Sequence, residues 1–582
     1  MRTHRFEKIR LGRAGRALTA AVSALACCLA LTACGFGSSV AEKEGQPSSP
    51  SSSSPSSSSS SERSNQEVTN MIRAYDTKPT DPLTPGQAED SSSTRIVDLI
   101  FSGLVTTDGT GKWTYDAAKD IEPNEDYTAF TVTLKSDLGF SNGTEVTSSS
   151  FTRAWSYEAN IANKQPNAGY LSLIQGYADL RKKGVSETKQ LSGLTILDDQ
   201  TFVIELSKPC LNFISLLSHR AFYPLPDSFY SNPQAFAKHP VGNGPYQFWE
   251  RTASSITLVT HLNYKDVRKA KNDGIIFIFY TSSIKAYQDV QEGKLDLLET
   301  VPSQAYTSFM SDPLVKNTNA SGSQVTMLVV GRKQKHFGLD DEGALRRQAI
   351  SRALRRTAMI SQAMPNLALP ATDFLSPKVM AYTDSLSGGQ VLTYSSVQAR
   401  NLWQKANKIK AWSSKDVITI SYDAQADNPQ LYQAISRQLT KVLGVTVILH
   451  GWTTTTAMIQ SLKKQTVNGF AAYTWRPNLL LAWDFLMPVF STQTLDSPAI
   501  NISGYNNQEF NVILSKAITA TTGSSASNLY RSSEELLLQE LPAIPLFYKN
   551  SFGVSSLTVR GFSLNWNGLP LYTQIRRIPQ SS

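Results

Sequence analysis

Segments with strand character and segments with helix character alternate between Asp416 and Thr474, and this alternation limits the possible fold more than any other feature. Apolar residues recur every four positions from Leu431 to Leu439, on one face of a helix that we expect to end at Gly444. Strands alternating with helices of this length form parallel βαβ crossovers, so we expect an α/β fold with a parallel sheet. The predicted strands are VITISY (417–422), VTVILHGW (445–452) and GFAAYTW (469–475), with a second helix near 454–464.

Two tryptophans stand at the ends of consecutive strands of this unit. Trp452 closes the second predicted strand and Trp475 closes the third. Most buried aromatic residues only fill a core. However, ligands of α/β proteins bind beyond the carboxyl ends of the strands, so both tryptophans are candidate ligand-binding residues.

Three further segments have clear patterns. AFTVTL (129–134) alternates as a strand does, residues 148–160 predict a helix, and residues 274–299 predict a strand, a helix and a strand. The segment 345–360 is rich in arginine, but its apolar residues repeat at helical spacing. We therefore expect an amphipathic helix with solvated arginines and no nucleic-acid patch.

The first 66 residues have the composition of an export and attachment segment. Six cations precede an apolar run that ends at residue 33, as in a signal peptide, and the run is short for a membrane-spanning helix. The order Leu31-Thr32-Ala33-Cys34-Gly35 resembles the lipobox of bacterial lipoproteins, which implies a diacylglyceryl group on Cys34 and attachment to a membrane. Residues 34–66 are rich in serine and proline, and we expect a disordered tether.

Processing changes the charge of the chain. Removal of residues 1–33 takes away six cations and one anion, and the formal charge falls from +9 to +4. This modest charge gives no support to a nucleic-acid partner. Of four cysteines, Cys210 alone remains in the folded body, so we expect no intramolecular disulfide and a buried free thiol there.

The sequence contains no catalytic, metal-binding or phosphate-binding motif that we recognise. The five histidines left after processing are far apart, and H-E-x-x-H, C-x-x-C, G-x-S-x-G and the phosphate loop are absent. We therefore predict no catalytic residue, no metal, no cofactor and no enzyme activity. A secreted hydrolase stays open as an alternative, because the fold could bring two carboxylates together.

Nine blocks in order resemble the extracellular solute-binding proteins of family 5, the oligopeptide- and dipeptide-binding receptors of ABC importers. The resemblance runs from about residue 68 to the C-terminus. The blocks are PTDPL (79–83), LIFSGLVTTDGTG (99–111), LGFSNGTEVTSSSF (138–151), LTILDDQTFVIELSKPCLNF (194–213), PVGNGPYQF (240–248), AYQDVQEGKLD (286–296), RRQAISRALRR (346–356), YNNQEFNVIL (505–514) and PAIPLFY (542–548).

The resemblance implies a two-lobed α/β fold of the periplasmic-binding-protein type, type II, from the large cluster with an extra subdomain in lobe I. A hinge would join the lobes. The implied division is signal peptide 1–33, tether 34–66, lobe I 67–103, extra subdomain 104–225, lobe I 226–320, lobe II 321–548 and lobe I 549–582.

The resemblance also implies ligand-binding residues. Trp452 and Trp475 match two cleft tryptophans of peptide-binding members, and Tyr548 or Phe547 matches an aromatic residue at the second crossing between the lobes. The charged positions differ. Asn478 replaces the aspartate that holds a peptide ammonium, Ala472 replaces an arginine, and Lys78, beside Thr77, replaces an acid near the cleft.

The function implied is a lipid-anchored, monomeric receptor on the outer face of the cytoplasmic membrane of a Gram-positive envelope. It would bind a peptide between its lobes and deliver it to permease subunits driven by a separate ATPase. Because Asn478 is neutral, an oligosaccharide or another non-peptide solute stays open. A surface adhesin or sensor that kept the fold is the alternative from another class.

Overall fold

The computed structural model describes residues 70–331, 334–424, 427–492 and 501–578. Contacts within the chain divide it into two units, Met1–Gln66 and Glu67–Ser582. The predicted signal peptide, Cys34 and the tether lie outside the described residues. The following paragraphs concern the second unit alone.

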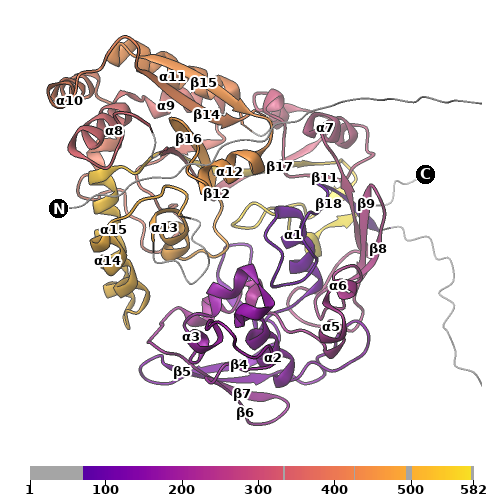
Figure 1. Ribbon diagram of the computed structural model, residues 1–582. Coiled ribbons are helices and arrows are strands. Elements are labelled where there is room, and N and C mark those ends of the chain that lie inside the picture. Colours follow the sequence, from indigo (N-terminus) through magenta and orange to yellow (C-terminus); the bar gives the residue numbers. More distant parts are fainter. Residues whose placement is uncertain (1–69, 332–333, 425–426, 493–500, 579–582) are drawn as a thin grey trace, which may run out of the picture. The chain divides into compact units, whose positions relative to one another are not determined.

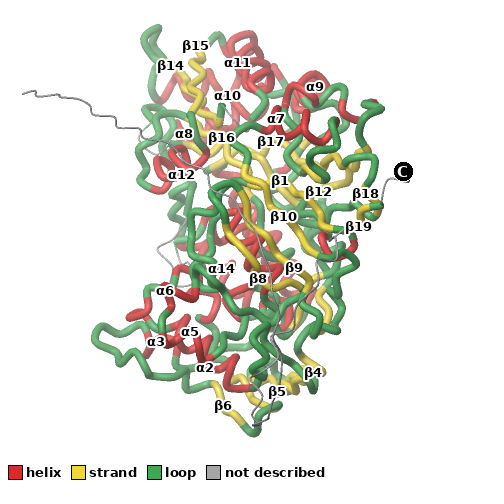
Figure 2. Tube along the Cα trace, turned by 90° about the vertical axis from the view of Figure 1, so that its right-hand side faces the viewer, coloured by secondary structure: helices red, strands yellow, loops and turns green. Residues whose placement is uncertain are grey.

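An eleven-stranded sheet organises this unit, in the order β15-β14-β16-β12-β17-β11-β1-β10-β9-β8, with β13 paired to β17. Figure 2 shows several of its strands running side by side. Its strands are β1 (Met71–Asp76), β8 (Tyr246–Arg251), β9 (Ser255–Thr260), β10 (Gly274–Phe279), β11 (Leu297–Leu298), β12 (Lys316–Val330), β13 (Ala368–Pro370), β14 (Val417–Asp423), β15 (Thr446–Trp452), β16 (Phe470–Trp475) and β17 (Ala543–Ser555).

The long strands β12 and β17 lie at the centre of this sheet. They pair antiparallel along most of their length, with register shifts between Ala320 and Gln324 and again after Thr326. β12 also pairs with β16, and β17 also pairs with β11. The two strands therefore join a first strand group (β1 and β8–β11) to a second strand group (β14–β16).

Each face of the sheet packs on its own apolar core, because side chains of a strand alternate between the two faces. Val325, Met327 and Val329 of β12 lie in the first core, whereas Leu328 and Val330 lie in the second. β16 alternates in the same way, with Ala471 and Tyr473 in the first core and Phe470 and Ala472 in the second.

A separate four-stranded sheet, β4-β5-β7-β6, packs near α2 around Trp155, which is fully buried and donates a hydrogen bond to Phe222 O at 2.9 Å. In Figure 1 this sheet lies at the end opposite to β14, β15 and α11. The remaining strands are β2 (Val105–Thr107), β3 (Trp113–Tyr115), β4 (Ala118–Pro123), β5 (Ala129–Leu134), β6 (Leu194–Ile196), β7 (Thr201–Glu205), β18 (Val559–Arg560) and β19 (Arg576–Arg577).

Helices flank both sheets. They are α1 (Ser91–Ile100), α2 (Ser148–Ala159), α3 (Tyr177–Leu180), α4 (Phe213–Leu216), α5 (Asp227–Ser231), α6 (Pro233–Phe236), α7 (Ser283–Gln291), α8 (Asp341–Ala353), α9 (Arg356–Ala363), α10 (Ser396–Ile409), α11 (Pro429–Leu443), α12 (Thr455–Lys463), α13 (Ala482–Phe490), α14 (Gln508–Ile518) and α15 (Gly523–Glu540). The short 3₁₀ helices η2 (Pro166–Leu171) and η3 (Arg220–Phe222) contribute to the site described below.

The βαβαβ unit predicted from the sequence is confirmed. β14 pairs parallel with both β15 and β16, and α11 and α12 are the crossovers. Asn428 caps α11 by accepting a hydrogen bond from Gln430 N, and Gly444 ends it with a φ of +71°. The strand at 129–134, the helix at 148–160 and the strand, helix and strand at 274–299 are also confirmed. Cys210 is a buried free thiol, also as expected.

The prediction of one helix with solvated arginines at 345–360 is wrong. α8 ends at Ala353 and α9 begins at Arg356. Arg346, Arg347 and Arg356 are buried, and the guanidinium group of each donates to at least one backbone carbonyl. Arg356, for example, donates to Pro545 O, Ser351 O and Leu392 O. These arginines therefore join elements of the fold and do not form a surface patch.

Gly469 sets the start of β16 and gives a first testable prediction. Its φ is +89°, and a Cβ added there would lie 2.2 Å from the Thr419 carbonyl oxygen of β14. Gly469→Ala should lower the free energy of unfolding by about 2–4 kcal/mol in denaturant titrations, from backbone strain plus the overlap. Gly523→Ala, where nothing lies within 4 Å of the added atom, is the control. Equal stability of the two variants would contradict this account.

Candidate functional site

The candidate site lies on the face of the large sheet that packs on the first core. Val325 of β12 pairs with Trp475 on one side and with Tyr548 on the other. Trp475 and Tyr548 both belong to the first core, so they share this face. With strands about 4.8 Å apart, their Cα atoms are separated by about 10 Å. The end of β16 and the middle of β17 are thereby brought together.

Two carboxylates from the first strand group lie on the same face. β1 and β11 are parallel, with Ala74 opposite Leu297, and continuing this register by two residues places Asp76 beside Glu299. Ala74 and Leu297 belong to the first core, and side chains two residues further along point to the same side. Both acids therefore stand at the carboxyl ends of parallel strands, where ligands of α/β proteins bind.

Arg95 of α1 bridges these two carboxylates. Its Nη2 lies 2.5 Å from Glu299 Oε1 and its Nη1 lies 3.4 Å from Asp76 Oδ1. Burial raises the pKa of both acids, and the Arg95 charge opposes that rise. Burial alone would lower the pKa of Arg95, but Glu299 and Asp76 hold it above its usual value. The three side chains are almost fully buried.

Arg476 brings a fourth charge from the second strand group. It directly follows Trp475. When the Gln324 side-chain amide is oriented with its oxygen toward Arg476, that oxygen accepts hydrogen bonds from Arg476 Nε at 3.3 Å and Nη2 at 3.2 Å. Arg476 is exposed, yet desolvation by the surrounding protein and the positive charge of Arg95 lower its pKa, while Glu299 raises it. We call Asp76, Arg95, Glu299 and Arg476 the charge cluster.

Asn478 is held by residues that precede β8 in the chain. Its Nδ2 donates to the Tyr170 hydroxyl at 3.0 Å, and its Oδ1 accepts from Arg220 Nη1 at 3.4 Å. Arg220 also pairs with Asp98 at 3.1 Å. Tyr170 stacks on His219, with ring centroids 3.5 Å apart. Both functional ends of the Asn478 amide are therefore engaged within the protein.

Asp484 fixes the backbone around Asn478. Its Oδ2 accepts hydrogen bonds from Asn478 N at 2.6 Å and Leu479 N at 2.8 Å, and its backbone carbonyl accepts from Trp475 Nε1 at 2.8 Å. The side chain is fully buried, and its Oδ1 has no hydrogen-bond partner among the described residues. Burial raises the pKa of Asp484 to about 7, although the two amides oppose this shift.

The structure places the ligand-binding residues expected from the sequence in different surroundings. Trp475 and Tyr548 share one face, but they are only 7% and 3% exposed. Phe547 belongs to the second core, on the opposite face. Trp452 is half-buried on the edge strand β15, with its Nε1 unpaired in the described residues. Thr77 and Lys78 are exposed, and Thr77 shares a hydrogen bond of 2.7 Å with Ser92.

Sequence reasoning missed the charge cluster and the partners of Asn478. Asp76 and Glu299 end strands, so the rule applied to the tryptophans could have marked them. Arg476 adjoins a marked residue. No signal in the sequence indicated that β1 pairs with β11, or that Tyr170 and Arg220 reach Asn478 across some 260 to 310 positions.

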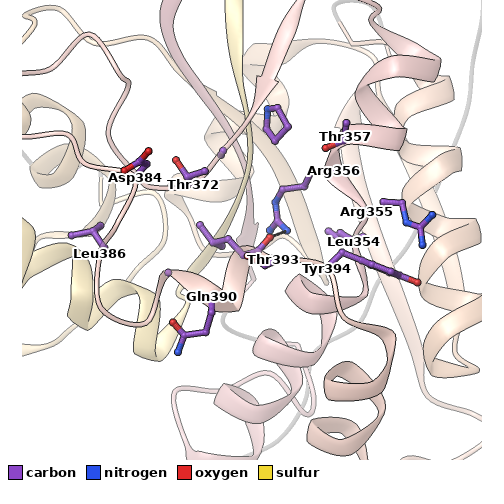
Figure 3. A pocket seen from close by; sticks show the side chains of 14 residues that line it. Leu354, Arg355, Arg356, Thr357, Thr372, Asp384, Leu386, Gln390, Thr393 and Tyr394 are labelled. Atoms are coloured by element: carbon purple, nitrogen blue, oxygen red, sulfur yellow. Dashed lines mark hydrogen bonds between the residues drawn. The ribbon is translucent and has the colours of Figure 1, made fainter.

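A cavity of about 410 Å³ lies beside the end of β13, where Pro370 is part of its lining, and Figure 3 shows the lining residues. Thr372 is one of them, and its amide donates to the Tyr548 hydroxyl at 3.2 Å. Arg355 lies over the Tyr394 ring at 4.5 Å, on the side of the cavity away from Asp384. Burial lowers the pKa of Arg356 to about 9, because its neighbours are neutral carbonyl and hydroxyl groups.

The described residues contain no group of three or more histidine, cysteine or acidic side chains arranged to hold a metal ion. Within the same residues, no helix has the length and apolar character that spanning a membrane requires.

Comparison with known proteins places this geometry in context. A sequence model of the bacterial extracellular solute-binding proteins, family 5 Middle, matches residues 112–496. The chain is 25% identical to the dipeptide-binding protein DppE of Bacillus subtilis, over 75% of this chain and 79% of DppE. It is 22% identical to the oligopeptide-binding protein OppA of the same organism, over 93% and 95% of the two chains.

Solved structures share the fold. The Escherichia coli murein tripeptide binding protein MppA matches with a TM-score of 0.74 at 19% identity, covering 88% of this chain and 99% of MppA. Haemophilus influenzae OppA in complex with RPPGFSPFR matches with a TM-score of 0.72 at 19% identity, covering 87% and 99%. The fold is accordingly the two-lobed, mixed α/β architecture of these binding proteins.

Asp484 gives a testable pH dependence. Because its pKa is about 7 in the folded protein and near 4 when unfolded, its contribution to stability is present at low pH and is lost as pH rises from about 4 to 7. The free energy of unfolding of the wild type should fall by on the order of 2–4 kcal/mol over that range because of Asp484, and in Asp484→Asn this fall should be absent. Denaturant titrations from pH 4.5 to 8 measure this, with the exposed Asp227→Asn as control. Parallel curves for wild type and Asp484→Asn would contradict it.

Proposed function

Because the chain belongs to the bacterial extracellular solute-binding proteins of family 5, we propose that it captures peptides and delivers them to an ABC importer. The peptide would bind between the two lobes, and the lobes would close around it by hinge motion. Permease subunits driven by a separate ATPase would receive it. In this role the protein is a monomeric receptor without catalytic chemistry.

The charge cluster is the observation that carries the peptide assignment. A peptide has an ammonium and a carboxylate group, and each needs an opposite charge when it leaves water. Carboxylates of the first strand group and the Arg476 guanidinium of the second offer both signs within electrostatic reach of each other. The relatives named above as peptide-binding proteins support the same class of ligand.

An oligosaccharide fits the described residues less well. Sugar rings stack their apolar faces on exposed aromatic rings, and Trp475 and Tyr548 are nearly inaccessible in this structure. Trp452, half-buried at the sheet edge, retains more accessible surface than Trp475 and Tyr548. The neutral Asn478 does not favour a sugar either, since its amide already binds Tyr170 and Arg220.

Attachment to the membrane is the second part of the proposal. A diacylglyceryl group on Cys34 would hold the protein on the outer face of the cytoplasmic membrane, in a Gram-positive envelope, with residues 35–66 as the tether. The division of contacts between Gln66 and Glu67 supports a boundary at that point. The lobe boundaries near 104, 226, 321 and 549 belong to the same proposal, as do Trp452, Trp475, Asn478, Tyr548, Phe547, Thr77 and Lys78 as residues near the ligand.

A ligand panel tests the solute class. Residues 34–582 with Cys34→Ser, purified free of ligand, should be stabilised by peptide mixtures and not by an oligosaccharide panel. A ligand at a hundred times its Kd adds about 2.7 kcal/mol, which raises the Tm by a few degrees. Shifts with oligosaccharides alone would overturn the peptide assignment. A folded protein that responds to neither panel would overturn the receptor role and favour an adhesin or sensor.

Metabolic labelling tests the anchor. In a Gram-positive host fed labelled palmitate, the wild-type protein should carry the label and sediment with membranes. Cys34→Ala should lose the label and leave the membrane fraction, because Cys34 is the proposed site of the diacylglyceryl group. Cys210→Ala, which alters the buried free thiol, is the matched control and should retain the label. Labelled Cys34→Ala protein would refute the lipoprotein assignment.

A further inference from the structure

We propose that the Glu299 carboxylate is the anchor for the cationic group of the bound solute, so that the site selects solutes with a free ammonium group. This inference rests on the proposed receptor function and adds to it a residue that determines specificity. Four observations support it: the balance of charge around Glu299, the hydrogen bonds that it lacks, the engagement of Asn478 and the position of Arg476.

The balance of charge is the first observation. Asp76 and Glu299 supply two carboxylates and Arg95 supplies one guanidinium, so the buried part of the cluster has an excess of acid. Asp90, which also acts on Asp76, adds a further negative charge. Tyr75 and Tyr572 are neutral phenols whose pKa burial raises further. A cation that approaches this group therefore gains electrostatic energy in a setting that water screens poorly.

The second observation concerns hydrogen bonds. The Glu299 side chain is 4% exposed, and its Oε1 is paired with Arg95 Nη2 at 2.5 Å, whereas its Oε2 accepts no hydrogen bond from the described residues. Asp76 Oδ2 also lacks a partner in this part of the chain. Buried acceptors without donors are costly in a folded protein. An ammonium group offers three donors and no acceptor, which is what these oxygens lack.

The third observation is that Asn478 is unsuited to bind the ammonium group. Its amide is neutral, its Nδ2 donates to Tyr170 and its Oδ1 accepts from Arg220. Arg220, which is bound to Asp98, brings a positive charge to this position that disfavours a second cation. An ammonium group must therefore find its counter-charge elsewhere. Asp484 already accepts hydrogen bonds from the Asn478 and Leu479 amides. The excess of acid at Asp76 and Glu299 offers a counter-charge, and Glu299 interacts electrostatically with Arg476 at the end of β16.

Arg476 provides a second point of attachment. The Arg476 side chain is exposed, and it interacts electrostatically with both Glu299 and Arg95. An anionic group on the same solute can pair with Arg476 while the ammonium group binds Glu299. A zwitterionic solute then pairs with both strand groups at once, because Glu299 follows a strand of the first strand group and Arg476 follows a strand of the second.

The experiment compares two forms of one peptide library. Tri- to pentapeptides with free amino termini are mixed with the same library after N-acetylation, and mass spectrometry measures which peptides the protein retains. Wild type should prefer the free amines by on the order of tenfold or more, the value of a charge-assisted hydrogen bond. Glu299→Gln should lower this preference to about threefold or less, whereas Glu299→Asp should keep most of it.

The matched control is Glu292→Gln. Glu292 lies seven positions before Glu299 in the chain, and its exposed carboxylate pairs with Lys294. It should leave the preference unchanged. An unchanged preference in folded Glu299→Gln would overturn the inference while the receptor function stands. Wild-type protein that retains no peptides would overturn the receptor function and the inference with it.

A measurement on wild type covers the case in which Glu299→Gln does not fold. Between pH 7 and pH 4 the peptide amine stays protonated, while the Glu299 and Asp76 carboxyls, whose pKa values are raised, take up protons. Arg95 and Arg476 stay charged, Tyr75 and Tyr572 stay neutral, and Asp90, whose pKa is lowered by its hydrogen bonds, stays largely ionised. The preference for free amines should fall by at least threefold over this range if these carboxylates hold the ammonium. A constant preference would overturn the inference.

Discussion

The antiparallel pairing of β12 with β17 is the constraint on which the rest of the structure depends. These strands continue the sheet from the first strand group to the second, so residues from both ends of the chain share one face. Trp475 and Tyr548 meet there because both pair with Val325. The two acids of the first strand group stand on the same face because β1 and β11 are parallel. Without the two long strands, the elements of the site would have no common frame.

The charges of this site are arranged differently from those that the family resemblance implies. The resemblance places an acid three residues after Trp475, and this chain has Asn478, whose amide joins Tyr170 and Arg220. The excess of negative charge lies instead in the first strand group, where Arg95 balances one of two buried carboxylates. In the proposed site, the loss of an acid at position 478 and the presence of Glu299 keep the capacity to bind a cation and change which strand group provides it.

Buried arginines show why local patterns mislead about exposure. The segment 345–360 has the apolar spacing of an amphipathic helix, and its arginines suggest a solvated face. In the structure the helix breaks at Leu354 and Arg355, and Arg347 donates to carbonyl oxygens of Phe337 and Glu540. Phe337 lies in the segment just before α8, whereas Glu540 is 193 positions away in the chain. A periodic pattern reports which residues share a face, but it does not report what that face packs against.

What the sequence by itself determined is local: the strands and helices of the βαβαβ unit, the caps at Asn428 and Gly444, the ends of the strands at Trp452 and Trp475, and membership of the family through blocks in order. These features depend on backbone preferences and side-chain spacing within a few turns of chain. Tertiary structure alone decided which strands pair, and with them the meeting of Asp76 with Glu299, the contacts of Asn478, and the burial of Phe547 on the opposite face. Those outcomes depend on contacts between residues some 170 to 310 positions apart, which are selected by the free energy of the whole packed core and are not encoded in any short pattern.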